Sequence, residues 1–115
     1  RSTLFPYTTL FRSWLTGSNS SALADYLERK ANALGIFSEV VAACDFGASE
    51  DFSYFMERVQ AHGGEAAYMM VGADLAAGHH DAHFTFDERA LSYAAKMMAA
   101  ATIGLLSGER AKKQK

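Results

Sequence analysis

The fold prediction depends on the apolar run AAYMMV at residues 66–71, which leads into GADLAAGHHDAH at residues 72–83. A continuous apolar run of this length is typical of a strand in a sheet that helices cover on both faces. A second run, at residues 36–43, is rich in β-branched and small apolar side chains and predicts another short strand, at its narrowest residues 39–43. The sequence therefore predicts at least two strands.

Three amphipathic helices are predicted around these strands. The first follows the polar cap residues 19–21 and ends at Gly35. The second follows Ser49 and ends before the glycines at residues 63–64, and the third follows Asp87 and ends near Leu106. The side chains expected to form the buried stripe of the second helix are Phe52, Phe55, Met56 and Val59. The order helix, strand, helix, strand, helix predicts an α/β layered architecture, whose two strands need neighbours because a two-stranded sheet is not stable alone.

Size and charge exclude several classes of protein. The chain has 115 residues, of which 50% are hydrophobic, so it can hold one modest core but cannot be a complete large enzyme. All thirteen acidic residues lie between residues 14 and 109, and such an acidic body argues against a nucleic-acid partner. The single cysteine, Cys44, cannot form an internal disulfide, and no apolar run approaches the ~18 residues of a membrane span. We therefore expect a cytoplasmic protein without a membrane partner.

Residues 1–13, RSTLFPYTTLFRS, differ in composition from the rest of the chain and contain an internal repeat of a Thr-Leu-Phe unit. The segment resembles the conceptual translation of a sequencing adapter, which would make it foreign to the protein. The alternative is a native β-hairpin or edge strand. On the first interpretation, the native sequence begins near Trp14.

Three of the four histidines, His79, His80 and His83, lie in a window of five residues. This window is in the loop that follows the run at 66–71. Ligands of open α/β sheets bind at the carboxyl ends of strands, and imidazole is a common ligand of zinc and manganese. Adjacent histidines point in different directions, however, so a polar loop without a metal remains an alternative. Glu50 and Asp51 also have two interpretations: metal ligands or acid–base groups, or favourable charges at the start of a helix.

Two stretches together resemble a known family. GASEDFSYF at residues 47–55 and GHHDAHFTFDE at residues 78–88 are similar to the C-terminal part of the M20 metallopeptidase and amidohydrolase family, above all its aminobenzoyl-glutamate, hippurate and auxin-conjugate hydrolases. Residues 19–107 follow the order of elements in that family. The resemblance implies that residues 14–107 form part of a three-layer α/β/α catalytic domain and that residues 108–115 form a basic flexible tail.

The resemblance also implies a site. In this family the first histidine of the loop binds the metal centre, and matching Phe84 and the following Asp-Glu pair to the family motif places that ligand on His80. His79, Glu50 and Asp51 would then contact a metal ligand or line the cleft. Alanine stands at position 82, where the family commonly has proline, which leaves the loop less rigid.

The activity that the resemblance implies is zinc- or manganese-dependent hydrolysis of an amide bond in a small N-acyl amino acid or dipeptide, with a metal-activated water as the nucleophile. The family's other metal ligands, its general-base glutamate and the lid domain through which the parent enzyme dimerises have no match in this sequence. We therefore expect the isolated chain to be inactive. The alternative is a small stand-alone metal-binding or interaction module that uses the histidine loop.

Overall fold

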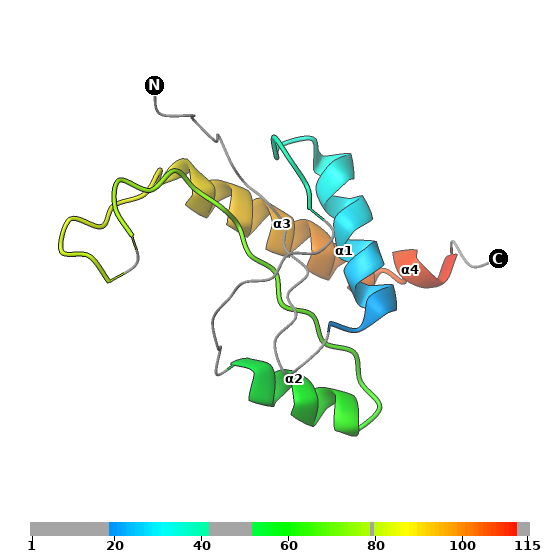
Figure 1. Ribbon diagram of the computed structural model, residues 1–115. Helices are drawn as coiled ribbons and strands as arrows, with labels where there is room; N and C mark the ends of the chain where they lie inside the picture. The colour runs from blue at the N-terminus through cyan, green and yellow to red at the C-terminus, as the bar shows by residue number, and fades with distance from the viewer. Residues whose placement is uncertain (1–18, 42–51, 79, 113–115) are drawn as a thin grey trace.

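A computed structural model describes residues 19–41, 52–78 and 80–112 of the chain. The elements in this part are four helices: α1 (Ser21–Leu34), α2 (Phe52–Ala61), α3 (Arg89–Leu106) and α4 (Glu109–Lys112) (Figure 1). The three predicted helices are thus confirmed over the described residues, although the predicted cap Ser49 lies outside them. The short α4 follows α3 after the turn at Gly108, where the backbone φ is 70°.

The prediction of an α/β fold is wrong. Neither residues 66–71 nor residues 36–41 form a strand, and the described part of the chain contains helices and a single isolated antiparallel bridge between Leu75 and Phe86. Residues 42–43 of the second expected strand lie outside the described residues. The reason is physical: apolar patterning makes a segment suitable for a sheet, but a strand exists only where a second strand supplies backbone hydrogen-bond partners.

The segment at residues 66–68 instead bonds to the polar residues in front of α1. The Ser20 N–H donates to the Ala66 carbonyl at 2.8 Å, and the Ala66 N–H donates to the Ser20 hydroxyl at 3.0 Å. The Tyr68 N–H donates to the Asn19 side-chain oxygen at 2.7 Å, and the Asn19 amide nitrogen donates back to the Tyr68 carbonyl at 3.3 Å. We call this arrangement the Asn19–Ser20 clasp. Side chains here satisfy backbone groups that a neighbouring strand would satisfy in a sheet.

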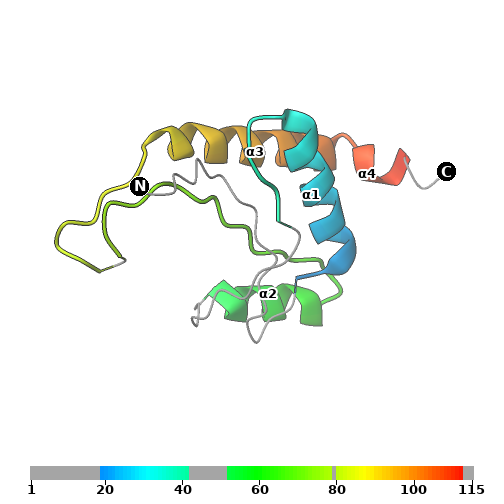
Figure 2. The same cartoon turned by 45° about the horizontal axis from the view of Figure 1, so that its top comes forward.

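The core is the contact between α1 and α3, which cross in Figures 1 and 2. Its buried side chains are Tyr26, Leu27, Ala31, Met97 and Ala101. The Tyr26 hydroxyl donates to the Ala101 carbonyl at 3.3 Å, which gives the buried phenol a partner. The helices approach closely at Gly104, where a Cβ atom would lie 2.1 Å from the Tyr26 hydroxyl oxygen.

The stripe predicted for α2 is only partly correct. Met56 is buried, but Phe52, Phe55 and Val59 are 45%, 67% and 44% exposed, and the small polar side chain of Ser53 is buried instead. Figure 2 shows that α2 lies away from α3, so it contacts the extended segment and leaves most of its apolar face in solvent. The ring of Phe52 packs against that of Tyr68, with 5.8 Å between centroids. Periodicity identified the helix, but the packing partner decides which of its side chains are buried.

Ion pairs connect α4 to the rest of the chain. Lys30 on α1 binds Glu109, and Arg110 binds Glu65 in front of the extended segment. The Lys30 pKa is raised above its ordinary value, chiefly by the hydrogen bond to Glu109, and the Glu65 pKa is lowered by the hydrogen bond from Arg110. Among the described residues, no helix combines the length and apolar character that a membrane span requires.

Two adjacent methionines on α3, one buried and one exposed, allow a test of which face of the helix forms the core. Met97 is fully buried, whereas Met98 is 55% exposed. We expect Met97→Ala to lower the free energy of unfolding by about 2–5 kcal/mol through cavity formation, and Met98→Ala to change it by less than about 0.5 kcal/mol. Urea unfolding followed by far-ultraviolet circular dichroism measures both. Equal losses in the two variants would contradict the assignment of the core face.

Candidate functional site

Residues 72–88 leave the extended segment, form the histidine loop and return to the start of α3. The two ends of the loop are tied together: the Ala76 N–H donates to the Thr85 carbonyl and the Asp87 N–H donates to the Asp74 carbonyl, both at 3.1 Å. The Leu75–Phe86 bridge lies between these bonds. The base of the loop is therefore fixed by backbone bonds, and it places Asp74 beside Asp87.

The tip of the loop consists of tight turns. The Asp81 N–H donates to the Gly78 carbonyl at 3.2 Å, and His80 within this turn has a φ of 67°, the only positive value among the described non-glycine residues. Asp81 in turn accepts a hydrogen bond from the His83 N–H at 2.7 Å, and its Oδ1 lies 3.3 Å from His83 Nδ1. These contacts orient His83 toward Asp81 and leave His80 exposed at the tip.

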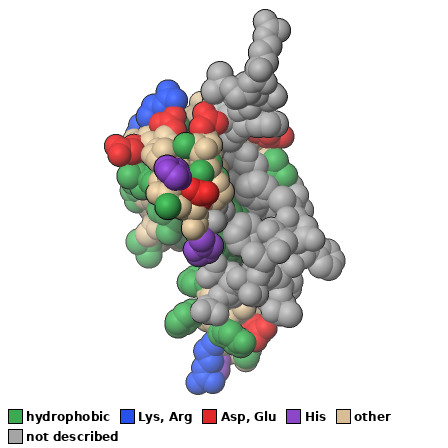
Figure 3. Space-filling view, turned by 60° about the vertical axis from the view of Figure 1, so that its left-hand side comes forward, with side chains coloured by type: hydrophobic (Ala, Val, Ile, Leu, Met, Phe, Trp, Pro, Cys, Tyr) green, Lys and Arg blue, Asp and Glu red, His purple; other side chains and the backbone are tan. Residues whose placement is uncertain are grey.

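The described residues include only part of the predicted metal site. His80 is exposed on the loop, whereas His79, Glu50 and Asp51 lie outside the described residues. Within the described part, no group of three or more histidine, cysteine, aspartate or glutamate side chains could hold a metal ion. Figure 3 turns the loop forward and shows histidine and acidic side chains exposed on this face among apolar ones. His80 is a suitable donor, but the described residues do not offer a complete set of ligands.

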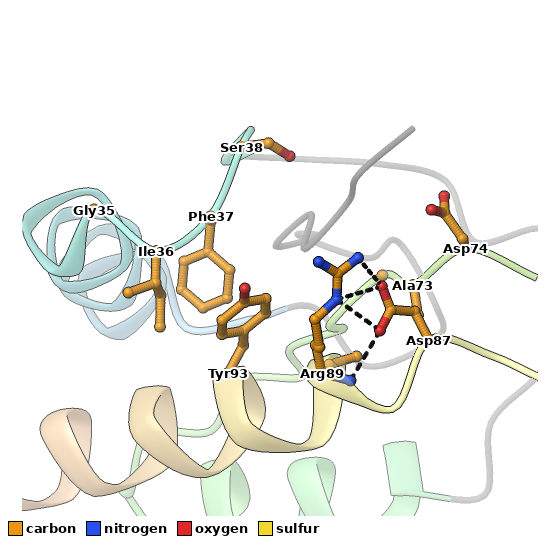
Figure 4. A pocket seen from close by; sticks show the side chains of 11 residues that line it. Gly35, Ile36, Phe37, Ser38, Ala73, Asp74, Asp87, Arg89 and Tyr93 are labelled. Carbon is orange, nitrogen blue, oxygen red and sulfur yellow. Dashed lines mark hydrogen bonds and ion pairs between the residues drawn. The ribbon is translucent and has the colours of Figure 1, made fainter. Parts of the chain in front are cut away.

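A pocket of about 290 Å³ lies at the base of the loop (Figure 4). Three segments form it: the turn after α1, the end of the extended segment, and the start of α3. Its lining residues are Gly35, Ile36, Phe37, Ser38, Gly72, Ala73, Asp74, Asp87, Arg89, Ala90 and Tyr93. We call it the loop-base pocket. Its volume is near the lower limit of small-molecule sites, which is about 300 Å³.

An aromatic pair forms one side of the loop-base pocket. The rings of Phe37 and Tyr93 meet edge to face, with centroids 6.4 Å apart and an interplanar angle of 72°. The turn that carries Phe37 starts at Gly35, which ends α1 with a left-handed φ of 62° that glycine adopts without strain. Sequence reasoning missed this pocket. Gly35 marked the end of α1 correctly and Asp87 lay one residue from the N-cap of α3, but nothing in a sequence shows that two helix ends so far apart in the chain face one another.

An ion pair forms the opposite side. Arg89 Nε lies 2.9 Å from Asp87 Oδ1 and 2.8 Å from Oδ2, and Arg89 Nη2 also donates to Oδ2. Asp87 Oδ1 accepts from the Arg89 backbone N–H at 3.0 Å as well. The predicted N-cap is therefore off by one residue: Glu88 occupies the N-cap position of α3, and the Asp87 side chain accepts the N–H of the first helical residue from the position before it.

The ion pair shifts the pKa values of both Asp87 and Arg89. The side-chain and backbone hydrogen bonds from Arg89 lower the pKa of Asp87, while the hydrogen bond to Asp87 raises the pKa of Arg89, with a small additional contribution from Asp74. Both groups are thus charged at neutral pH. Because Asp74 adds a second carboxylate, the polar side of the loop-base pocket combines one guanidinium with two carboxylates. This arrangement can bind and orient a ligand.

The Asp87–Arg89 pair predicts a pH dependence for the start of α3. Because the folded-state pKa of Asp87 is lowered from 3.8, its stabilising effect is fully present above that value and is lost as the pH falls through the lowered pKa. Carbon-detected NMR titration of the Asp87 carboxyl, with amide shifts of Arg89 and Ala90, measures the transition. Asp87→Asn retains a side-chain oxygen for the cap but should abolish the transition. An unchanged transition in this variant would assign it to another group.

Comparison with curated proteins finds local similarity to three hydrolases. The chain is 56% identical over 46 residues to a homologue of p-aminobenzoyl-glutamate hydrolase from Haemophilus influenzae, a match that covers 40% of this chain and 11% of that protein. It is 49% identical over 51 residues to a polypeptide of the p-aminobenzoyl-glutamate hydrolase of Escherichia coli, covering 44% of this chain and 12% of that protein. It is 38% identical over 72 residues to indole-3-acetyl-aspartic acid hydrolase of Enterobacter agglomerans. This match covers 63% of this chain and 16% of that protein.

The chain thus spans only 11–16% of the length of these curated relatives. No protein-family model and no solved structure matches it significantly. The similarity agrees with a fragment of an amidohydrolase family that includes aminobenzoyl-glutamate hydrolases, which confirms the resemblance drawn from the two motifs.

Proposed function

We propose that this chain forms part of a metal-dependent amidohydrolase of the M20 type, which hydrolyses the amide bond of an N-acyl amino acid such as p-aminobenzoyl-glutamate. The observation that carries the proposal is the 56% identity over 46 residues to a relative of that name. The relative from Enterobacter agglomerans acts on indole-3-acetyl-aspartic acid, which is also an aromatic acyl group joined to an acidic amino acid. The proposed substrate is therefore a small molecule with an aromatic acyl group.

We place one metal ligand of the hydrolase on His80, with zinc or manganese as the metal. The donor type suits both ions. Two features of the loop support the choice: the His80 imidazole is exposed, and the neighbouring His83 is held by Asp81. His79, Glu50 and Asp51 are proposed as neighbours of that ligand or of the cleft.

The remaining parts of the catalytic centre are proposed to lie elsewhere in the hydrolase, because the described residues offer no complete ligand set. They include the other metal ligands, the general base and a lid domain that makes the enzyme a homodimer. A cytoplasmic location is proposed from the single cysteine. The contribution of this chain is to hold His80 on a loop whose two ends are fixed by the bonds at Asp74 and Ala76.

A chimera tests the function. Residues 72–88 of this chain replace the stretch of the Escherichia coli relative that aligns with them, and hydrolysis of p-aminobenzoyl-glutamate is measured. We expect activity in the chimera. His80→Ala should then reduce kcat/KM by at least about 10³-fold if the imidazole binds the metal, a loss in the range of other essential catalytic groups. Metal content, measured by mass spectrometry, should fall as well.

The matched control in the same chimera is His83→Ala. Its side chain is 92% exposed and pairs with Asp81, so we expect activity within about twofold of the unsubstituted chimera. Full activity in both variants would show that the loop register is wrong. A metal-free chimera with full activity would overturn the metal dependence.

The isolated 115-residue chain should be inactive on p-aminobenzoyl-glutamate with added zinc or manganese, because a single imidazole does not hold a catalytic ion. Calorimetric titration should give zinc binding no tighter than about 10 µM, with no rise in the melting temperature. Turnover by the isolated chain would refute the fragment interpretation. Tight binding of one zinc ion with a rise in melting temperature would favour the stand-alone metal-binding module instead.

A further inference from the structure

The loop-base pocket has no role in the function proposed so far, yet it belongs to the same structural unit as His80. Residues 72–74 line it together with Asp87, Arg89, Ala90 and Tyr93, and the loop with His80 at its tip connects these two segments. The backbone bond from the Asp87 N–H to the Asp74 carbonyl fixes the base of the loop and places the two carboxylate residues together. A ligand in this pocket would therefore contact the residues from which the loop departs.

The shape and polarity of the pocket favour a planar aromatic group. Phe37 and Tyr93 offer an apolar edge, and the guanidinium of Arg89 offers a flat cationic surface. In Figure 4 Arg89 lies between the aromatic pair and the two carboxylates. Asp87 holds the guanidinium through Nε and Nη2, which fixes its plane. Arginine side chains stack on aromatic rings in this way.

The charge of the polar side determines which end of a substrate can enter. Asp87 neutralises Arg89, and the carboxylate of Asp74 remains as an excess negative charge near the guanidinium. A carboxylate ligand would be repelled here, whereas an N–H donor would find an acceptor. The acidic amino-acid end of an N-acyl amino acid is thus excluded, and the aromatic acyl end fits.

We propose that the loop-base pocket binds the aromatic acyl group of the substrate. The ring stacks on Arg89, with the Phe37–Tyr93 pair on one side of it. On the other side an N–H of the ring system donates to the Asp74 carboxylate. Asp74 is then the residue that selects an acyl group carrying an N–H donor. The proposal rests on the proposed function for the identity of the substrate, but the pocket can be tested without catalysis.

The test uses the full 115-residue chain and two neutral probes, 4-aminobenzamide and benzamide, which share the carboxamide and differ only in the amino group on the ring. Amide NMR titration measures affinity and location. We expect shifts at Gly72, Ala73 and Ala90, and about tenfold tighter binding of 4-aminobenzamide, the gain from one hydrogen bond to a charged acceptor. Asp74→Asn should remove most of this difference, and Tyr93→Leu should weaken both probes. Circular dichroism confirms that each variant keeps its helices.

Glu57→Gln is the matched control, since it removes an exposed carboxylate on α2 and should leave both affinities unchanged. Equal binding of the two probes, or shifts confined to other parts of the chain, would overturn the proposal. Tighter binding of benzoate than of benzamide would overturn it too, because the pocket would then accept a carboxylate. If the chimera is active but the probes do not bind as expected, the proposed role of the pocket is wrong and the hydrolase function stands. If the probes bind as expected but the chimera is inactive, the hydrolase function is wrong and the binding of aromatic groups in the pocket stands.

Discussion

The contact between α1 and α3 is the constraint on which the other features depend. At its centre the buried Tyr26 hydroxyl reaches the Ala101 carbonyl, and a Cβ atom at position 104 would displace the ends of the Tyr26, Glu109 and Lys30 side chains. This crossing brings the end of α1 near the start of α3, and these two helix ends supply most of the lining of the loop-base pocket. It also places Lys30 within reach of Glu109, so the chain after α3 is tied to α1.

The extended segment is held by a different interaction. The Asn19–Ser20 clasp satisfies backbone groups of Ala66 and Tyr68, and the packing of Met69 and Ala67 against the α1–α3 core adds apolar contact. The position of the segment thus depends on polar side chains at a helix start as well as on its own apolar residues. The clasp then determines where the histidine loop begins, because the loop is the direct continuation of this segment.

Sequence alone predicted what local chemistry determines. Gly35 ended α1 because glycine adopts a left-handed φ, and α3 begins within two residues of Asp87, whose side chain accepts the Arg89 N–H. Strand formation and burial on α2 depend on partners far away in the chain, so the apolar run at residues 66–71 led to the wrong fold class. The loop expected after the apolar run is present in the described residues, but the Phe37–Tyr93 pair arises only from the crossing of two helices.

The conformation of His80 connects the loop to this framework. A left-handed backbone costs a non-glycine residue roughly 1–2 kcal/mol, and it persists only where the surrounding structure enforces it. Here the turn that Asp81 closes onto Gly78 enforces it locally, and the bonds at Asp74 and Ala76 prevent the loop from relaxing by spreading its ends. The same bond between Asp87 and Asp74 shapes the polar side of the loop-base pocket. One short antiparallel pairing therefore controls both the presentation of the exposed imidazole and the geometry of the pocket beneath it.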